Sequence, residues 1–366
     1  MTYLDRASVL LSAIRAQGRY REVRTHGVVG ELDFSSNDYL GLARHPQVVE
    51  AFHRAGRVGA GGARLLGGAY REQSLLEEEL AAWLGREQVL LFSSGYLAAL
   101  GAIAVLSRTV DYIYSDRLNH ASLIDGIRGT RVERFIYDHA AFPFRTQRRG
   151  NALIITESIF GMDGDAIDLE AMLEQMGDGD VLLIDEAHAL GVTGERGAGR
   201  ARALDDPRIV ILGTLSKAFG ALGGFIAGPA ILIDLLVNEA RTFIFDTALP
   251  PAIALAARVA LVLIRDGDEA RGRLHENAAR LREGLRALGF AAHDGPSPVV
   301  PVVLGSENRA VEIARCLEGM RIVAPAIRPP TVPKGSSRLR LSVRSDHQRE
   351  HIDLLVQGLA KCIATS

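Results

Sequence analysis

Short apolar runs alternate with helix-length segments through the first two thirds of the chain. Each run has the length of a buried strand and is bounded by polar residues or glycine. Strands separated by helical segments predict an α/β fold, in which helices cover both faces of a mainly parallel sheet. Strands are expected at residues 89–92, 112–114, 152–156, 181–185, 209–213 and 224–227.

The two ends of the chain have other patterns. Residues 4–17 have the pattern of a helix, and residues 1–44 are too few to form a domain, so they are expected to form an arm. The end of the chain mixes helical and strand patterns, which predicts a smaller α+β domain over residues 249–366, after a large domain over residues 45–248. Its helices are expected at 251–288, 308–320 and 347–363, and its strands at 299–304 and 339–343.

Composition narrows the class of protein. The chain has 366 residues, of which 48% are hydrophobic and 23% charged, and its net charge is −2. This balance is typical of a globular protein and lacks the basic excess of a nucleic-acid-binding protein. The most apolar segment, 253–264, is interrupted by Arg258, so no membrane span is expected.

The chain has two cysteines, Cys316 and Cys362, which lie far apart and outside any CxxC or Cys/His cluster. This spacing indicates neither a disulfide framework nor a thiolate metal site, and both residues are expected to be small core residues. A reducing, cytoplasmic location is therefore expected.

Two polar residues follow predicted buried strands. Asp185 ends the strand at 181–185, and Lys217 lies shortly after the strand at 209–213. Parallel strands bring both side chains to the carboxyl edge of one sheet, where α/β folds bind ligands. A lysine amine that holds an aldehyde as a Schiff base, with a carboxylate beside a pyridine nitrogen, is the pattern of a pyridoxal phosphate (PLP) site. Taken singly, Lys217 could be a solvated loop lysine and Asp185 a helix cap; the pair favours the cofactor site.

A phosphate site is expected where the strand at 89–92 turns into a helical pattern. The free amides at the start of that helix, at Gly95 and Tyr96, would face an anion, and Tyr96 could cover a ring. The glycine-rich segment 56–68 matches no phosphate-loop motif and is expected to be a loop that allows close backbone approach.

Two histidines have alternative interpretations. His120 alone would be read as a core histidine, and His188 could also be structural. Because His188 leaves the same strand as Asp185, it is well placed to contact the phenolic oxygen of the cofactor. A zinc site formed by these residues would leave Lys217 unexplained, so no metal is expected.

With these residues in view, the chain resembles the α-oxoamine synthase family of fold-type I PLP enzymes. The resemblance runs along nearly the whole chain and is highly specific to the family. It implies a fold-type I transferase with a PLP-binding large domain. The matching segments are 34–41, 116–122, 156–165, 185–188, 214–220 and 326–333.

The resemblance also implies roles for residues. Lys217 would be the Schiff-base lysine and proton-transfer base, Asp185 the partner of the pyridinium, and His188 a contact to the phenolic oxygen. His120 would stack on the cofactor and orient the substrate. Gly95, Tyr96 and Thr214 would hold the phosphate, with Thr247 reaching a phosphate across a homodimer interface. Substrate positions would be Arg21, Asn37, His120, Arg328, Thr331 and Arg340.

The implied reaction is a decarboxylating condensation of an amino acid with an acyl thioester carried by coenzyme A or an acyl carrier protein. The segment 328–333 favours L-alanine and a pimeloyl thioester, and the alternative is glycine or serine with another acyl group. Arg340 would bind the amino-acid carboxylate. Several positions depart from the family by losing a hydroxyl or gaining a charge: Ala60, Gly67, Gly161, Phe245 and Asp246.

Overall fold

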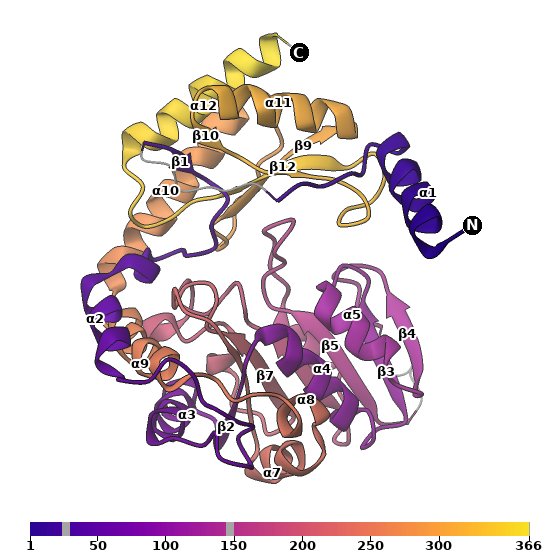
Figure 1. Ribbon diagram of the computed structural model, residues 1–366, viewed down its shortest axis with the longest axis vertical. Coiled ribbons are helices and arrows are strands. Elements are labelled where there is room, and N and C mark those ends of the chain that lie inside the picture. Colours follow the sequence, from indigo (N-terminus) through magenta and orange to yellow (C-terminus); the bar gives the residue numbers. More distant parts are fainter. Residues whose placement is uncertain (24–29, 144–149, 366) are drawn as a thin grey trace.

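A computed structural model describes residues 1–23, 30–143 and 150–365 and contains a central sheet between helices (Figure 1). Among these residues, seven strands form the sheet in the order β2-β8-β7-β6-β5-β3-β4. Neighbouring strands are parallel except at β8, which is antiparallel to both β2 and β7. The strands are β2 (Gln88–Phe92), β3 (Tyr112–Asp116), β4 (Glu133–Tyr137), β5 (Ala152–Glu157), β6 (Val181–Asp185), β7 (Ile209–Thr214) and β8 (Gly224–Gly228).

The mainly parallel α/β sheet expected from the sequence is confirmed, and each of the expected strands is present. The sequence pattern missed β4, which pairs with β3 at the edge of the sheet. Four of its five residues are exposed, so its sequence lacks the apolar run that marks a buried strand.

Alternate side chains of the sheet enter two separate cores. Leu182 and Ile184 of β6 pack in one cluster, and Leu183 between them packs in the other. Since side chains alternate across a strand, both faces of β6 are buried, which explains its continuous apolar sequence. The helices of the large domain are α2 (Pro46–Arg54), α3 (Arg71–Leu84), α4 (Gly95–Leu106), α5 (Ala121–Arg128), α6 (Leu169–Glu174), α7 (Ala230–Glu239) and α8 (Arg241–Ile244), with short 3-10 turns at Leu42–Arg44, Glu195–Gly197 and Ala201–Ala203.

The C-terminal part forms the smaller α+β domain, drawn in orange and yellow (Figure 1). Its antiparallel sheet has the order β11-β12-β9, and β10 pairs in parallel with β1 of the arm. The arm is thus joined to the small domain by backbone hydrogen bonds. The elements are β1 (Leu32–Asp33), β9 (Val299–Gly305), β10 (Ile322–Val323), β11 (Ala326–Ile327), β12 (Ser337–Ser342), α9 (Pro251–Arg265), α10 (Asp268–Ala287), α11 (Glu307–Gly319) and α12 (Arg349–Ala364).

The single helix expected over residues 251–288 is wrong, because α9 ends at Arg265 and α10 begins at Asp268. At Gly267 a side chain would lie 2.5 Å from the carbonyl oxygen of Leu263, so glycine permits the sharp break. Helix α9 packs against α2 and α3, while α10 packs against α12. The domain boundary near residue 249 stays a prediction.

The expectation of two separate core cysteines is also wrong. Cys316 of α11 and Cys362 of α12 form a disulfide, with their Cα atoms 5.8 Å apart. Their separation of 46 residues carries no pairing signal by itself. The pairing follows from the packing of α11 against α12, which brings the two side chains together.

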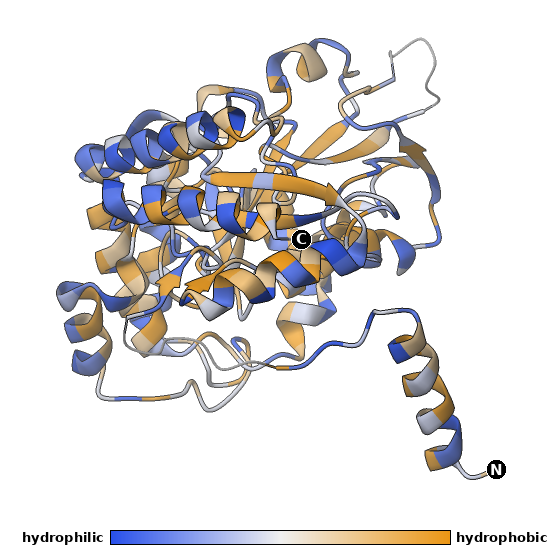
Figure 2. Cartoon of the chain, turned by 90° about the horizontal axis from the view of Figure 1, so that it is seen from above, coloured by the Kyte–Doolittle hydropathy of each residue, from blue (hydrophilic) through white to orange (hydrophobic). Residues whose placement is uncertain are grey.

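Helix α1 (Tyr3–Ala16) stands away from the rest of the protein in two perpendicular views (Figures 1 and 2). None of its residues is buried, although Leu4, Val9 and Leu10 are apolar. Thr2 caps its start and Asp5 completes the capping box, so the helix is locally well formed. Within the described part of the chain, no helix is long and apolar enough to cross a membrane.

Candidate functional site

The carboxyl edge of the central sheet forms one side of a cavity of about 220 Å³. Asp185 is the last residue of β6 and Thr214 the last residue of β7, and Lys217 follows β7 by three residues. Parallel strand ends and the loops after them therefore converge on one space, as the sequence predicted. The predicted residues that line it are Gly95, Tyr96, His120, Asp185, His188, Thr214 and Lys217.

Lys217 and His188 are in direct contact, with Lys217 Nζ 2.8 Å from His188 Nε2. Burial lowers the pKa of Lys217 to about 8, although the charge of Asp185, and that of Glu157 when it is ionised, act in the opposite direction. Burial also lowers the pKa of His188 well below its ordinary value, so its ring is neutral at neutral pH. A substantial share of the Lys217 amine is thus neutral near pH 8, the form that can act as a nucleophile or a base.

A chain of hydrogen bonds joins Lys217 to Arg340. His188 Nδ1 lies 2.7 Å from Tyr39 Oη, and Tyr39 Oη donates to Asn37 Oδ1 at 3.2 Å. Arg340 Nη1 donates to the same oxygen at 3.0 Å. Because His188 is neutral, a tautomer with hydrogen on Nδ1 would donate to Tyr39 and accept from Lys217 at Nε2. Two predicted substrate residues, Asn37 and Arg340, are therefore coupled to the lysine.

Tyr39 is a site residue that the sequence reasoning missed. It lies within the matching segment 34–41, but a single aromatic residue in a loop gives no separate signal of function. The structure buries Tyr39 completely and orients its hydroxyl towards His188. Its pKa is raised by burial, so the hydroxyl keeps its proton and remains available as a donor.

A second carboxylate, Glu157, lines the cavity beside Asp185. It ends β5 and pairs in register with Asp185 of β6. Burial, followed by the charge of Asp185, raises the pKa of Glu157 to about 8, so this carboxyl is protonated at neutral pH. Asp185 Oδ1 accepts from the backbone N–H of Ala187 at 2.9 Å. A polar residue ending an apolar strand next to Asp185 was a signal for Glu157 that the prediction did not use.

The start of α4 faces the same cavity. Ser94 is the N-cap, and its hydroxyl accepts from the N–H of Leu97 at 3.2 Å. The N–H groups of Gly95 and Tyr96 belong to the first turn, which a helix leaves without intrahelical acceptors. Thr214 Oγ1 lies beside this turn, because a Cβ on Gly95 would be 3.3 Å from it. These groups could bind an anion and form a candidate phosphate cradle at the edge of the sheet.

His120 lies at the mouth of the cavity, as the N-cap of α5. Its Nδ1 is 2.8 Å from Ser122 Oγ and also accepts from the Ser122 backbone N–H at 3.2 Å. Its ring lies edge-on to Tyr96, with 6.5 Å between ring centres. Burial lowers the pKa of His120, partly offset by Asp185, so the ring is neutral and able to stack on a flat ligand.

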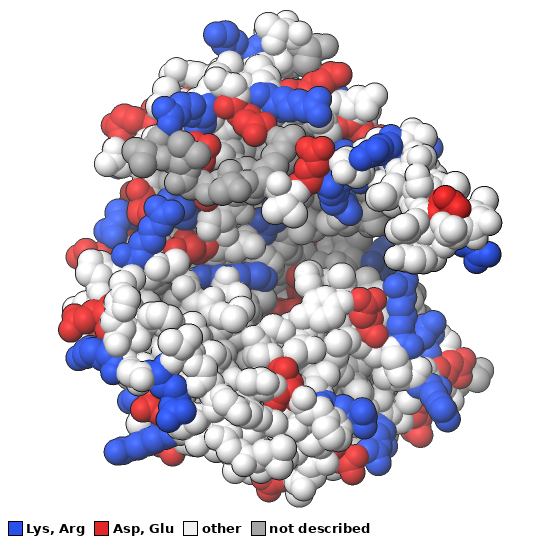
Figure 3. Space-filling view, in the orientation of Figure 1, with Lys and Arg blue, Asp and Glu red and all other residues white. Residues whose placement is uncertain are grey.

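Three predicted substrate residues lie elsewhere, between the arm and the small domain. Arg21 and Arg328 line a cavity of about 380 Å³, and Arg21 Nη2 donates to Thr331 Oγ1 at 3.4 Å. Arg328 donates to the backbone oxygens of Gly18 and Tyr20, at 2.6 and 3.4 Å. Arg328 thus holds the arm in place. Figure 3 shows Lys and Arg side chains around the hollow between the two domains.

Thr247 lies outside the cofactor cavity of its own chain, where it is exposed and bridges to Ala63. Its neighbour Asp246 accepts a hydrogen bond from Ser93 Oγ, just before the phosphate cradle. This bond gives a partner to the carboxylate of Asp246, one of the positions expected to depart from the family pattern. Phe245 is exposed, and the guanidinium of Arg241 lies 4.7 Å from the centre of its ring.

The other positions expected to depart from the family pattern, Gly161, Gly67 and Ala60, have different surroundings. At Gly161 a Cβ would lie 2.2 Å from His188 Nε2, so glycine leaves the space that His188 occupies. At Gly67 a Cβ would meet nothing within 4 Å, whereas Ala60 is buried. The glycine-rich loop brings backbone segments close, as predicted: a Cβ on Gly68 would be 2.1 Å from the oxygen of Gly62.

The donor set fits a PLP molecule. The amine of Lys217, the carboxylate of Asp185 and the anion cradle at Gly95 and Tyr96 line one cavity, beside the neutral ring of His120. These are the groups that an aldehyde, a pyridine nitrogen, a phosphate and a flat ring require. In the part of the chain that the structure describes, no group of three or more His, Cys, Asp or Glu side chains is arranged to hold a metal ion.

Comparison with known proteins gives consistent matches. Residues 29–359 match the model of the family described as aminotransferase class I and II. An 8-amino-7-oxononanoate synthase of Methylococcus capsulatus is 42% identical and covers 99% of both chains. A solved serine palmitoyltransferase of Sphingomonas wittichii has a TM-score of 0.90 at 26% identity, covering 100% of this chain and 98% of the other. A solved 8-amino-7-oxononanoate synthase of Francisella tularensis has a TM-score of 0.78 at 26% identity, covering 92% and 98%.

Proposed function

The chain belongs to the aminotransferase class I and II family and, within it, to the α-oxoamine synthases, and from this premise we propose that it is an 8-amino-7-oxononanoate synthase. The reaction condenses L-alanine with a pimeloyl thioester, on coenzyme A or an acyl carrier protein, and releases carbon dioxide; the product is an intermediate of biotin biosynthesis. The observation that carries the proposal is the convergence of Lys217, Asp185, His188 and His120 on one cavity, in a chain 42% identical to a synthase of this name.

PLP, when bound, supplies an electron sink for the negative charge that develops at the α-carbon of the amino acid. The carboxylate of Asp185, at the end of β6, would pair with the pyridine nitrogen and favour its protonated form. Gly95, Tyr96 and Thr214 would hold the phosphate, and His120 would lie against the ring.

Lys217 Nζ would be the attachment point for the cofactor and the base that takes the α-proton of the substrate. Its lowered pKa keeps a share of the amine neutral for this work, and neutral His188 can accept a hydrogen bond from it. Arg340 binds the substrate carboxylate, and the chain through Asn37 and Tyr39 fixes its position. Holding the carboxylate aligns the bond that breaks on loss of carbon dioxide.

The acyl thioester is proposed to enter between the arm and the small domain. Arg21, Arg328 and Thr331 border this entrance, and the terminal carboxyl of a pimeloyl chain is a partner for Arg21.

We propose a cytoplasmic location, because acyl thioesters of coenzyme A and acyl carrier protein are intracellular. The disulfide between Cys316 and Cys362 would be unusual in such a reducing compartment, and thiol labelling of the protein from cells would show whether the two residues are paired there.

The substrate assignment is tested by a panel of amino acids and acyl thioesters. L-Alanine with pimeloyl thioester is expected to have the highest kcat/KM. Glycine is expected to retain some activity, because one methyl group is worth only about 1–3 kcal/mol in a pocket. If glycine or serine with another thioester exceeded alanine with pimeloyl thioester by about tenfold, equivalent to about 1.4 kcal/mol, the protein would be a sister synthase of the same family.

We further propose a homodimer in which Thr247 reaches the phosphate bound by the partner. The exposure of Thr247 and its position outside the cavity of its own chain support this arrangement. Mixing Lys217→Ala protein with Thr247→Ala protein is expected to produce hybrid dimers with one intact site, and hence more activity than either parent. Exchange of subunits is verified by a size-tagged chain, and full activity in a monomer would contradict the shared site.

A further inference from the structure

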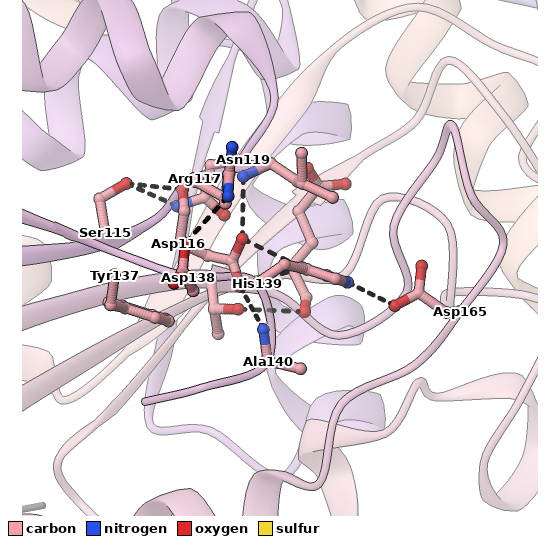
Figure 4. Close-up of polar contacts among 12 residues, drawn as sticks. Ser115, Asp116, Arg117, Asn119, Tyr137, Asp138, His139, Ala140 and Asp165 are labelled. Atoms are coloured by element: carbon pink, nitrogen blue, oxygen red, sulfur yellow. Dashed lines mark hydrogen bonds and ion pairs between the residues drawn. The ribbon is translucent and has the colours of Figure 1, made fainter. Parts of the chain in front are cut away.

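A charged cluster outside the cofactor cavity is centred on His139 (Figure 4). His139 Nδ1 lies 3.1 Å from both carboxylate oxygens of Asp116, at the end of β3, and Nε2 lies 2.6 Å from Asp165 Oδ2. An imidazole can donate to both sides only when it is protonated. The bonds to Asp116 and Asp165 raise the pKa of His139 to about 10, so the ring carries a positive charge at neutral pH.

Asp165 belongs to a closed loop, residues 158–167, between β5 and α6. The N–H of Phe160 donates to the oxygen of Asp165 at 2.9 Å, and the N–H of Gly164 donates to the oxygen of Phe160 at 2.8 Å. The buried Phe160 ring packs edge-on against His139, with 4.4 Å between ring centres. His139 therefore holds both sides of the base of this loop.

The tip of the loop holds two arginines of β12, in the small domain. The oxygen of Gly161 accepts from Arg340 Nε at 2.6 Å, and Arg338 Nη1 pairs with the carboxylate of Asp163. Arg340 and Arg338 are each about 95% buried, with 5% of their surface exposed. The loop is thus a bridge between the edge of the large sheet and the strand that carries Arg340.

We propose that His139 is a positioning residue for the amino-acid substrate: by holding the loop 158–167, it places the guanidinium of Arg340 to receive the substrate carboxylate. This inference rests on the proposed role of Arg340. His139 itself does not line the cavity that contains Lys217, so it acts through the loop.

The expected effect is selective, because Arg340 has other partners. Its Nη1 also donates to Asn37 Oδ1 at 3.0 Å and to Ser342 Oγ at 2.9 Å. Loss of the support under Gly161 would move the guanidinium without leaving it unbound. Binding of the carboxylate should weaken, while attachment of the amine at Lys217 should not.

The test uses the holoenzyme of His139→Gln, a neutral side chain that cannot bridge two carboxylates as a cation. The absorbance of the bound cofactor is followed during titration with L-alanine and with L-alaninamide, which lacks the carboxylate. The Kd for L-alanine is expected to rise about tenfold, in line with loss of a hydrogen bond to a charged group, and the Kd for L-alaninamide to stay within about twofold. Asp165→Asn should have the same selective effect, with a higher Kd for L-alanine and an almost unchanged Kd for L-alaninamide.

Two comparisons separate positioning from a general structural role. Asp138→Asn is the matched control, because Asp138 is adjacent to His139 but its carboxylate is exposed and pairs with Arg117 at 2.9 Å. It should leave both constants unchanged. In a double-mutant cycle with Arg340→Ala, adding His139→Gln should raise the Kd for L-alanine no further, because both changes remove the same interaction.

Equal weakening of L-alanine and L-alaninamide would overturn the proposal, as would additive effects in the cycle. If neither His139→Gln nor Asp165→Asn retained cofactor, His139 would be a structural residue and the proposal would likewise be wrong. The substrate panel, measured on the wild-type protein, tests the proposed function separately. If that panel favoured glycine or serine, the same titrations with that amino acid and its amide would test His139.

Discussion

The cofactor side and the substrate side of the active site are built in different ways. On the cofactor side, Asp185, Thr214 and Lys217 come from two neighbouring strands and the loops after them, within 33 residues of sequence. On the substrate side, Asn37 comes from the arm and Arg340 from the small domain, and their hydrogen bond joins positions 303 residues apart. The cofactor side is therefore the edge of one sheet, whereas the substrate side forms where arginine side chains bind separate segments of the chain.

This difference has a consequence for how each side responds to change. A residue at the sheet edge is held by a backbone whose neighbouring strands are buried on both faces, so a substitution there removes a chemical group and little else. A residue on the assembled side also holds segments together. Substitutions on the substrate side are therefore expected to alter substrate binding by moving the segments that these residues hold together. The following predictions test this contrast.

Lys217→Ala is expected to have the largest effect, because it removes the amine on the cofactor side that is proposed both to attach the cofactor and to move the proton. Turnover should be abolished, and borohydride should no longer fix the cofactor to the protein. Reduction followed by peptide mapping is the measurement. A cofactor trapped at another lysine would show that the sheet edge does not supply the attachment point.

Asp185→Asn should retain cofactor while losing about 10²–10³ in kcat, the usual cost of removing one essential electrostatic group. The isosteric amide keeps the local packing, so thermal stability should change little. Measurement of kcat together with cofactor content separates chemistry from binding. Near-normal turnover would mean that another group holds the proton on the ring nitrogen.

The pH dependence of cofactor attachment should report the lowered pKa of Lys217. With a pKa of about 8, the neutral fraction of this amine rises about tenfold between about pH 7 and pH 9, whereas an ordinary lysine remains almost fully protonated there. The rate of cofactor uptake by apoprotein, followed by absorbance, should reach half its maximum near pH 8. A midpoint above about pH 10 would show that burial does not lower this pKa.

Gly161→Ala tests the place where the cofactor side and the substrate side meet, because Gly161 lies beside His188 and its oxygen accepts from Arg340. The added methyl would lie 2.2 Å from His188 Nε2, so His188 must move away from Lys217. We expect kcat to fall about fivefold, a smaller loss than at Asp185, because overpacking at such a contact costs roughly 1–3 kcal/mol and part of it can relax. Gly67→Ala in the open loop is the control and should leave kcat unchanged.

Arg328→Ala should have the smallest effect, on the assembled side only. It removes two hydrogen bonds to the arm at a partly exposed position, so the KM for the acyl thioester should rise about two- to threefold. The Kd for L-alanine should not change, because the carboxylate site at Arg340 is separate. An equal effect on both substrates would show that the arm also shapes the amino-acid site.

The sequence predicted the cofactor side better than the substrate side. Val181–Asp185 was recognisable as a strand from its apolar run alone, and a polar residue at its end had to lie at the sheet edge. Edge strand β4 has no such run and was missed. The roles of Arg21, Arg328 and Arg340 came from resemblance, and only the structure places Arg340 in hydrogen-bonding reach of Asn37 and Arg328 on the backbone of the arm.

The sequence by itself determined the α/β sheet and the convergence of Asp185 and Lys217, because side-chain period and strand direction are local properties of the chain. The tertiary structure alone decided the contacts between distant segments: the chain from Lys217 to Arg340, the bridge of His139 to Asp165, and the bond between Cys316 and Cys362. Such contacts depend on how elements pack. Local periodicity contains no information about that packing, so residues tens to hundreds of positions apart become neighbours without a sequence signal.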